Sequence, residues 1–318
     1  MVFLLIAGVL SVPLPLVVLA PGSAVSVGER VDLGRPADEL SGELLLTTVR
    51  LFRPSGFGVI GAWISDNQEV LSRDEVFPEG VDSQEYEQAQ RQLFRESSEV
   101  AAAVGLRAAG EAVDISGQGV LVAQVIEGSV AADVLRPGDV ITGVDGQPVE
   151  VASDLVSALA SRVEGDRVLL TVEREGAEME LEVELRTVEE LGRPALGVAV
   201  TTVDLRISLP FPVEVDQGRI GGPSAGLMIA LTVFDLADPG DLVAGRTVAG
   251  TGTITLDGEV GPVGGVDAKV VAAREAGATL FLVPEDEAEL ARQVADDDLE
   301  VLPVGTLEEA IAALEPAA

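Results

Sequence analysis

The stretch TGTITLDGEVGPVGGVDAK, Thr251–Lys269, decides the fold of the C-terminal part of the chain. Residues 248–256 read as strands that end at an Asp257-Gly258 turn, and a Gly-Gly pair precedes a helix that we expect over residues 267–276. Upstream, the stretch GGPSAG, Gly221–Gly226, opens another helix that we expect to run to about residue 236. Because strands and helices alternate, residues 188–318 are predicted to form an α+β or α/β domain.

Lys269 is the only lysine of the chain, since every other basic side chain is arginine. It lies in the first turn of the second expected helix among apolar residues, where the helix dipole and burial both lower the pKa of an amine. A neutral amine can take the proton of a serine hydroxyl, the general-base role that histidine often fills. The alternative is a surface lysine paired with Asp267 or another carboxylate.

Ser224 stands where an expected strand passes into the first helix, directly after Pro223, a residue that fits the first helical turn. Free amides at a helix N-terminus favour developing negative charge, as an oxyanion hole requires. Two alternatives stay open for this residue: a serine that caps its helix, or a glycine-rich turn that binds nothing. Ser224 and Lys269 are too far apart in the sequence for the S-x-x-K pattern of β-lactamases.

Composition excludes several classes of function. The chain has 318 residues with 54 acidic and 20 basic side chains, a formal net charge of −34, and this acidity argues against a nucleic-acid partner. The sequence has no histidine and no cysteine, which excludes a Ser–His–Asp triad, a thiol nucleophile and a His- or Cys-ligated metal. The single lysine is not part of a Gly-Lys-Ser/Thr loop, so a P-loop ATPase is excluded. The run Asp296-Asp297-Asp298 reads as a solvated loop, and we expect no metal and no cofactor.

The N-terminal residues 2–20 carry no charged side chain. A helix of this length crosses a bilayer core of about 30 Å, so we expect residues 1–20 to form a transmembrane anchor. A cleaved signal peptide that ends at Val18-Leu19-Ala20 is the alternative. Residues 21–110 are expected to form strands over 24–64 and then a helix over 82–109. This segment could pair with the sheet of the C-terminal domain. The residues between the two, 111–187, would then be an insertion in that domain.

Residues 111–187 form a compact unit in the sequence. The motifs are GVLV from Gly119, GSVA from Gly128, LRPGDVI from Leu135 and the Asp145-Gly146 turn. In this order they resemble a PDZ domain of the bacterial protease type. The resemblance implies capture of extended peptides by addition of a strand to a sheet edge. The sequence does not identify the loop that would bind a peptide carboxylate.

The stretches Gly222–Gly226 and Thr251–Lys269, followed by AAREAGA at 272–278 and LVP at 282–284, resemble the proteolytic domain of Lon proteases over about residues 190–315. The whole chain is similar to a membrane-anchored, PDZ-containing Lon-like protease that lacks the ATPase. This resemblance implies a serine endopeptidase with a Ser–Lys dyad. Ser224 would be the nucleophile and Lys269 the general base, Thr251 would orient the lysine, and the backbone amides of Gly222, Ser224 and Ala225 would form the oxyanion hole.

Two positions depart from the pattern of the ATP-dependent Lon enzymes, which usually carry Asp where this chain has Gly221 and Glu where it has Thr253. The loss of two nearby carboxylates should raise the fraction of neutral lysine. Without an ATPase, the substrates should be proteins or peptides that are already unfolded or extended. The resemblance also implies a single-pass protein of the cell membrane with an extracytoplasmic catalytic domain, and a homo-oligomeric ring.

The predicted architecture is therefore an α+β multidomain chain. It comprises a transmembrane helix, a β/helical segment that packs on the protease domain, a PDZ domain at 111–187 and a Lon-type α/β proteolytic domain at 188–318. Two other functions stay open. One is a membrane-tethered PDZ scaffold whose protease-like domain does not hydrolyse, and the other is a different Ser–Lys hydrolase such as an amidase.

Overall fold

The computed structural model describes residues 16–35, 41–65, 67–77, 81–126, 129–188 and 193–315. The chain forms two compact units. The first unit combines the residues up to Ala112 with Leu209–Ala318, and the second is Val113–Ser208. The PDZ-like unit is therefore inserted into a domain built from both ends of the chain, the arrangement that the sequence left open.

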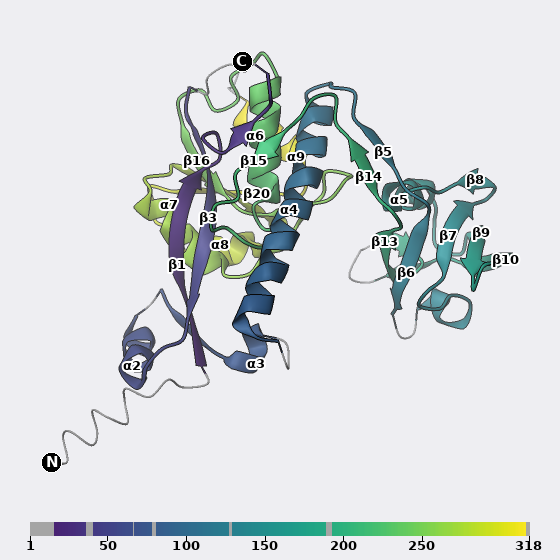
Figure 1. Cartoon of the computed structure of the whole chain (residues 1–318), viewed down its shortest axis with the longest axis horizontal. Helices are drawn as coiled ribbons and strands as arrows, with labels where there is room; N and C mark the ends of the chain where they lie inside the picture. Colours follow the sequence, from purple (N-terminus) through teal and green to yellow (C-terminus); the bar gives the residue numbers. More distant parts are fainter. Residues whose placement is uncertain are drawn as a thin grey trace. The chain divides into compact units, whose positions relative to one another are not determined.

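The first unit is organised by one six-stranded sheet (Figure 1). Its strands are, in spatial order, β20 (Glu300–Val304), β19 (Leu280–Pro284), β16 (Thr247–Gly250), β3 (Glu43–Phe52), β1 (Leu16–Ser26) and β4 (Glu69–Ser72). The C-terminal strands pair in parallel, and β16 also pairs in parallel with β3, with Leu45 opposite Ala249. Strands β1, β3 and β4 pair antiparallel. The N-terminal and C-terminal halves thus share one sheet.

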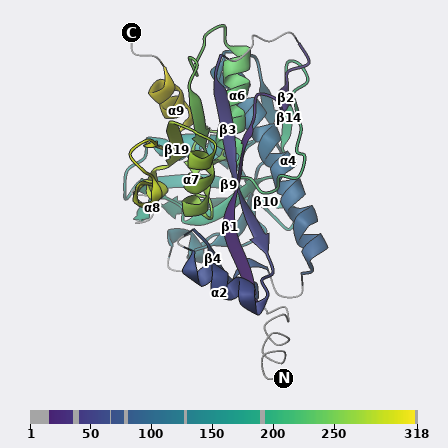
Figure 2. The same ribbon diagram turned by 90° about the vertical axis from the view of Figure 1, so that its left-hand side faces the viewer.

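Helices cover both faces of this sheet. Leu45, Ala249 and Phe281 belong to a buried cluster with α7 (Val266–Glu275) and α8 (Ala288–Val294). On the other face lies α6 (Gly226–Ala237), which packs against α4 (Ser83–Ala108), as Figures 1 and 2 show. The approach of α4 to α6 requires Gly105, because a Cβ there would lie 2.4 Å from the carbonyl oxygen of Ala230. The helix α9 (Leu307–Leu314) also contacts α6.

Smaller elements complete the first unit. Helix α2 (Gly56–Ile64) follows β3, and α3 (Arg73–Val76) follows β4. Two short antiparallel pairs join β2 (Val31–Asp32) to β15 (Glu214–Val215) and β17 (Thr253–Ile254) to β18 (Val260–Gly261). A single 3-10 turn, η3 (Glu285–Glu287), precedes α8.

The anchor helix predicted over residues 1–20 is wrong for its last five residues. Leu16–Ala20 begin strand β1, in which Val17, Val18 and Ala20 are buried. Strand β1 pairs with β3 on one side and with β4 on the other. Because a strand in the middle of a sheet is largely buried, its sequence can be as free of charge as that of a membrane helix. Residues 1–15 lie outside the described part of the chain. Within that part, no helix combines the length and the apolar character that crossing a bilayer would require.

The described residues of the second unit form a five-strand antiparallel path, one α-helix and a 3-10 turn, η1 (Val130–Asp133). The strands run in the order β10 (Ala177–Glu184), β9 (Arg167–Arg174), β7 (Val140–Val144), β6 (Val120–Val125) and β13 (Val198–Thr202), with β8 (Gln147–Pro148) beside β7. The helix is α5 (Ala152–Ala160). An ion pair joins the motif that begins at Leu135 to strand β9. Arg174 Nε lies 2.7 Å from Oδ1 of the buried Asp139.

The structure corrects the boundary that we placed at residue 187. Strand β13 pairs antiparallel with β6 and so belongs to the PDZ-like sheet. The described residues from 193 to Ser208 group with this unit and not with the C-terminal domain. Two short strands, β5 (Asp114–Ser116) and β14 (Arg206–Ser208), pair where the chain enters and leaves this unit. A hairpin-like pair, β11 (Arg186–Val188) with β12 (Arg193–Ala195), precedes β13.

Candidate active site

Ser224 lies in a turn that precedes α6. The helix begins at Gly226 with Ala225 as its N-cap, so the prediction that Pro223 forms the first helical turn is wrong by about one turn. Backbone hydrogen bonds to one residue, Gly252, hold this turn. The amide of Gly252 donates to the carbonyl oxygen of Ser224 at 3.0 Å, and the amide of Leu227 donates to the carbonyl oxygen of Gly252 at 3.1 Å. The serine therefore has a fixed backbone position beside the end of β16.

Lys269 and Thr251 meet at this turn. The side chain of Lys269, in the first turn of α7, is only 2% exposed, and its Nζ donates to Thr251 Oγ1 at 3.0 Å. Thr251 Oγ1 in turn donates to the carbonyl oxygen of Ser224 at 3.1 Å. Two consecutive hydrogen bonds thus connect the amine of Lys269 to the backbone of Ser224, and the buried threonine between them fixes where the amine lies.

The predicted lowering of the Lys269 pKa is confirmed, and burial is its cause. Desolvation disfavours the ammonium form and lowers the pKa of Lys269 to about 8, while the negative charge of Glu287 acts in the opposite direction. An amine with a pKa of about 8 is neutral in about a tenth of the molecules at pH 7. It can therefore accept a proton, which a lysine in water at its ordinary pKa of 10.5 rarely can.

Glu287 is a residue that the sequence analysis missed. Both of its carboxylate oxygens accept from the amide of Val263, at 3.1 and 3.2 Å, which ties η3 to the segment before α7. The pKa of Glu287 is raised above its ordinary value because burial outweighs the opposite effects of the Val263 amide and the charge of Lys269. In the sequence it belongs to the acidic run Glu285–Glu287, which has the composition of a solvated turn, so no sequence signal marks it.

The three backbone amides predicted for the oxyanion hole differ in whether they already donate a hydrogen bond. Within the described part of the chain, no acceptor is hydrogen-bonded to the amides of Ser224 and Ala225. The amide of Gly222 is engaged, because it donates to the carbonyl oxygen of Gln90 at 2.8 Å. The prediction for Gly222 therefore needs correction in this conformation: its amide holds the loop on α4 and is not free for a substrate.

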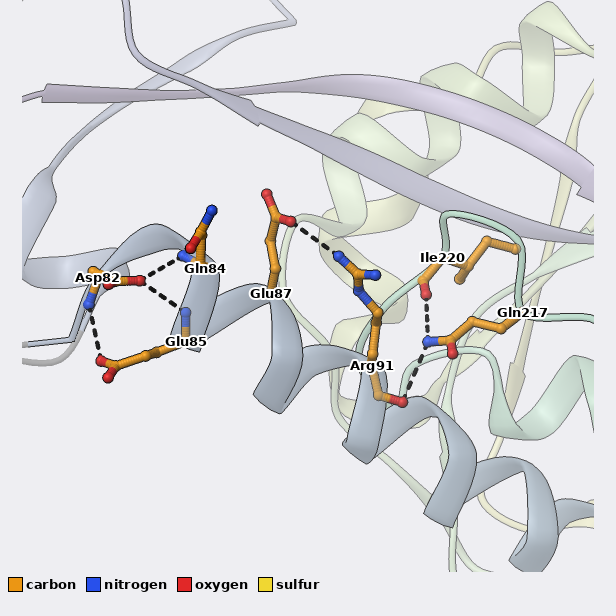
Figure 3. A network of polar contacts seen from close by, with 7 residues as sticks. All are labelled: Asp82, Gln84, Glu85, Glu87, Arg91, Gln217 and Ile220. Carbon is orange, nitrogen blue, oxygen red and sulfur yellow. Dashed lines mark hydrogen bonds and ion pairs between the residues drawn. The ribbon is translucent and has the colours of Figure 1, made fainter.

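Helix α4 holds the loop at further points. Ser97 Oγ donates to the carbonyl oxygen of Pro223 at 3.1 Å. Six residues earlier in α4, the carbonyl oxygen of Arg91 accepts from Gln217 Nε2 at 3.2 Å, and Gln217 Nε2 also donates to the carbonyl oxygen of Ile220 at 2.8 Å (Figure 3). The polar side of this helix has the acidic, glutamine-rich composition of a solvated face. Its partners lie more than a hundred residues away in the chain, so no local pattern identifies the contact.

The start of α4 is itself fixed by a capping box, which Figure 3 also shows. Asp82 accepts from the amides of Gln84 and Glu85, at 2.7 and 2.9 Å, and Glu85 accepts from the amide of Asp82. An ion pair between Glu87 and Arg91, at 3.1 Å, follows one turn later. The helix that carries Gln90 therefore begins at a defined residue.

A second candidate site lies within the PDZ-like unit. Strand β13 is the last strand of its sheet, and helix α5 contacts it. The amide of Ala152, at the start of α5, donates to Thr202 Oγ1 of β13 at 3.0 Å. The strand follows Gly197, which adopts a φ of 72°. This edge, which the sequence did not identify, has the geometry needed to accept one more strand.

None of the described residues forms a cluster of three acidic side chains that could hold a metal ion. The groups that the structure places around Ser224 include its own hydroxyl, the buried amine of Lys269 and backbone amides.

Comparison with known proteins assigns the two units. Residues 80–185 match the family model of the PDZ domain, and residues 209–315 match that of the Lon protease (S16) C-terminal proteolytic domain. The two resemblances seen in the motifs are thereby confirmed. The PDZ match begins before α4, although the structure places that helix in the other unit.

Two curated relatives illustrate the likeness. The Lon protease of Phenylobacterium zucineum is 33% identical over 202 residues, 60% of this chain and 24% of that protein. Lon protease 2 of Bacillus subtilis is 32% identical over 117 residues, 36% of this chain and 20% of that protein. The chain thus spans about a quarter or less of the length of these relatives. A crystal structure of the PDZ domain of an SdrC-like protein from Listeria monocytogenes is 28% identical, with a TM-score of 0.25, over 26% of this chain and 87% of that one.

Proposed function

We propose that this chain is an ATP-independent serine endopeptidase in which Ser224 is the nucleophile and Lys269 the general base. One observation carries the proposal. The amine of Lys269 is buried, has a pKa of about 8, and is joined through Thr251 to the backbone of Ser224. The match of residues 209–315 to a Lon proteolytic domain supports the same assignment.

The reaction follows from these groups. The neutral amine of Lys269 takes the hydroxyl proton of Ser224 as Oγ bonds to the carbonyl carbon of the substrate, and the carbonyl π bond becomes an oxyanion. The amides of Ser224 and Ala225 donate to that oxyanion. The tetrahedral intermediate collapses, the peptide C–N bond breaks, and the ammonium of Lys269 returns its proton to the leaving amine. Water then cleaves the acyl-enzyme with the lysine again as base.

Thr251 has a positioning role in this scheme. Its hydroxyl donates to the Ser224 carbonyl, so its lone pairs are left to accept from Lys269. The amine is thereby held in one direction instead of sampling several rotamers. The free edge of β13 would bind an extended peptide as an added strand, and this suits substrates that are already unfolded.

A second candidate function is a PDZ scaffold that binds peptides without cleaving them. The observation that favours it is the hydrogen bond from Gly222 to Gln90, which occupies one of the three amides that the resemblance assigns to the oxyanion hole. Attachment to the cell membrane, an extracytoplasmic location of the catalytic domain and assembly into a ring stay predictions. They rest on the resemblance and, for attachment, on the uncharged sequence of residues 2–15.

The test is incubation of the full chain with a denatured protein, with cleavage sites read by mass spectrometry. We expect peptides from the wild type and none from Ser224→Ala. Ser98→Ala is the matched control, because this buried serine donates only to the carbonyl oxygen of Phe94 in its own helix. A fluorophosphonate probe should modify Ser224 in the wild type and fail to do so in Lys269→Met. Peptide release by Ser224→Ala would show that Ser224 is not the nucleophile. An unlabelled Ser224 in a folded wild type without activity would favour the scaffold.

A further inference from the structure

Helix α2 exposes a large apolar face. Val59 and Ala62 are buried, whereas Ile60 is 47% exposed and Trp63 and Ile64 are each 78% exposed. The exposed residues follow the spacing i, i+3, i+4, so they share one side of the helix. Contiguous apolar side chains on a surface mark a site of interaction. The helix itself is well formed, because Ser55 Oγ accepts from the amide of Gly58 at its start.

Helix α2 and the sequence that leads into it have almost no charge. From Leu51 to Ser65 the only charged residue is Arg53, in a chain of which 23% of the residues are charged. Leu51 and Phe52, at the end of β3, add to the exposed apolar area. A protein partner held by ion pairs would have almost nothing to pair with here. A hydrocarbon surface requires no such groups.

The position of α2 gives a second argument. Ala62 forms a small buried cluster with Val18 and Ala20 of β1, against which Val70 of β4 packs. Strand β1 pairs with β4 so that Leu16 lies opposite Ser72. Helix α2 therefore lies at the end of the sheet where the chain arrives from residues 2–15, which have no charged side chain (Figures 1 and 2). The uncharged sequence of residues 2–15 thus leads directly into the strand against which α2 packs.

We propose that the face formed by Ile60, Trp63 and Ile64 docks on the surface of a lipid bilayer with zwitterionic headgroups. Tryptophan prefers the boundary between water and hydrocarbon, and aliphatic side chains beside it favour shallow insertion. The net charge of −34 repels anionic lipid, so the attraction has to be apolar. This docking goes beyond the proposed peptidase activity and does not depend on it.

The chain contains its own probe, because Trp63 is its only tryptophan. Phosphatidylcholine vesicles added to the full chain should shift the emission of Trp63 to shorter wavelength. Vesicles that contain brominated phosphatidylcholine should quench it. Attachment through residues 2–15 is separated from docking of this face by a variant that changes α2 and leaves residues 2–15 intact.

Variants separate the possible outcomes. Ile60→Asp with Ile64→Asp keeps the tryptophan and should remove both the shift and the quenching, whereas Val163→Asp, at an exposed valine of the other unit, should leave them unchanged. Circular dichroism checks that the variants are folded. A wild-type chain that floats with vesicles while Trp63 emission stays constant overturns the proposal. So does emission that changes with protein concentration and ignores vesicles, since the partner is then a second copy.

Discussion

Lys269 Nζ lies 3.0 Å from Thr251 Oγ1, and neither side chain is more than 2% exposed. This contact places a basic amine where water has little access. A neutral hydroxyl stabilises the ammonium form of a buried lysine much less than a carboxylate does, so burial lowers the pKa of this lysine. The only carboxylate that opposes the effect of burial on its pKa is that of Glu287.

Peptidase activity should rise as pH increases through about 8, because only the neutral form of Lys269 can take the serine proton and its pKa is about 8. The acidic limb of kcat/KM against pH should have its midpoint there. Lys269→Arg should be inactive at every pH, since arginine does not lose its proton in this range. An acidic limb centred near pH 6 would contradict the assignment of the base.

Glu287→Gln should move this acidic limb to lower pH. The carboxylate of Glu287 stabilises the ammonium of Lys269, so its removal lowers the pKa of the lysine further. The glutamine can still accept from the Val263 amide through Oε1. Glu285→Gln, at an exposed carboxylate of the same turn, is the control and should leave the midpoint in place. Equal profiles for wild type and Glu287→Gln would remove Glu287 from the site.

Thr251→Val should reduce kcat about 100-fold, because the lysine loses the group that orients it. Thr251→Ser keeps the hydroxyl and should recover most of the rate. Valine matches threonine in shape, so circular dichroism should show a native fold. Labelling of Ser224 by a fluorophosphonate should slow in parallel with kcat. If the valine variant labels at the wild-type rate, Thr251 has only a structural role.

Ser97→Ala should lower kcat about two- to tenfold with little change in KM, as the loss of one hydrogen bond of about 1 kcal/mol implies. Ser97 holds the carbonyl of Pro223, next to the proposed nucleophile, whereas the neighbouring Ser98 donates within its own helix. Ser98→Ala is therefore the matched control. Steady-state kinetics measure kcat and KM of both variants. Equal values of kcat would show that the bond from Ser97 does not position the loop that carries Ser224.

Asp139→Asn should destabilise the PDZ-like unit, since a neutral amide with one acceptor oxygen replaces the carboxylate that accepts two hydrogen bonds from Arg174. Arg174 lowers the pKa of Asp139, so this stabilisation is present above the ordinary value of 3.8 and is lost as pH falls through the lowered pKa. Thermal unfolding should show one transition at lower temperature and one unchanged. If the unfolding temperature of the whole chain fell in a single transition, the two units would not unfold independently and the prediction would fail.

Short motifs predicted both domains because their glycines and turns determine local structure. The Asp145-Gly146 turn is an example, with φ angles of 50° and 77° at these residues. Lys269 could also be singled out, since its burial follows from the apolar residues around it in α7. These features depend on neighbours in the sequence, and such features can be predicted without coordinates.

The errors have a common physical origin in pairing between distant segments. Leu16–Ala20 have the composition of a membrane helix, yet β3 and β4 make them a buried strand. Strand β13 returns to β6, which no motif near residue 187 announces. The engagement of the Gly222 amide depends on Gln90, in a helix whose polar face resembles a solvated surface. No local pattern contains these partners.

The insertion of the PDZ-like unit has a consequence for synthesis of the chain. Strand β3 pairs with β16, and the two residues joined by the bond from Thr47 Oγ1 to the Gly250 carbonyl are 203 positions apart. At about 5 to 20 residues per second, a ribosome takes roughly 10 to 40 s to cover that interval. During this time the nascent β3 has no parallel neighbour, while the inserted unit can already fold as it emerges. The first strands therefore need protection from aggregation until the last third of the polypeptide arrives.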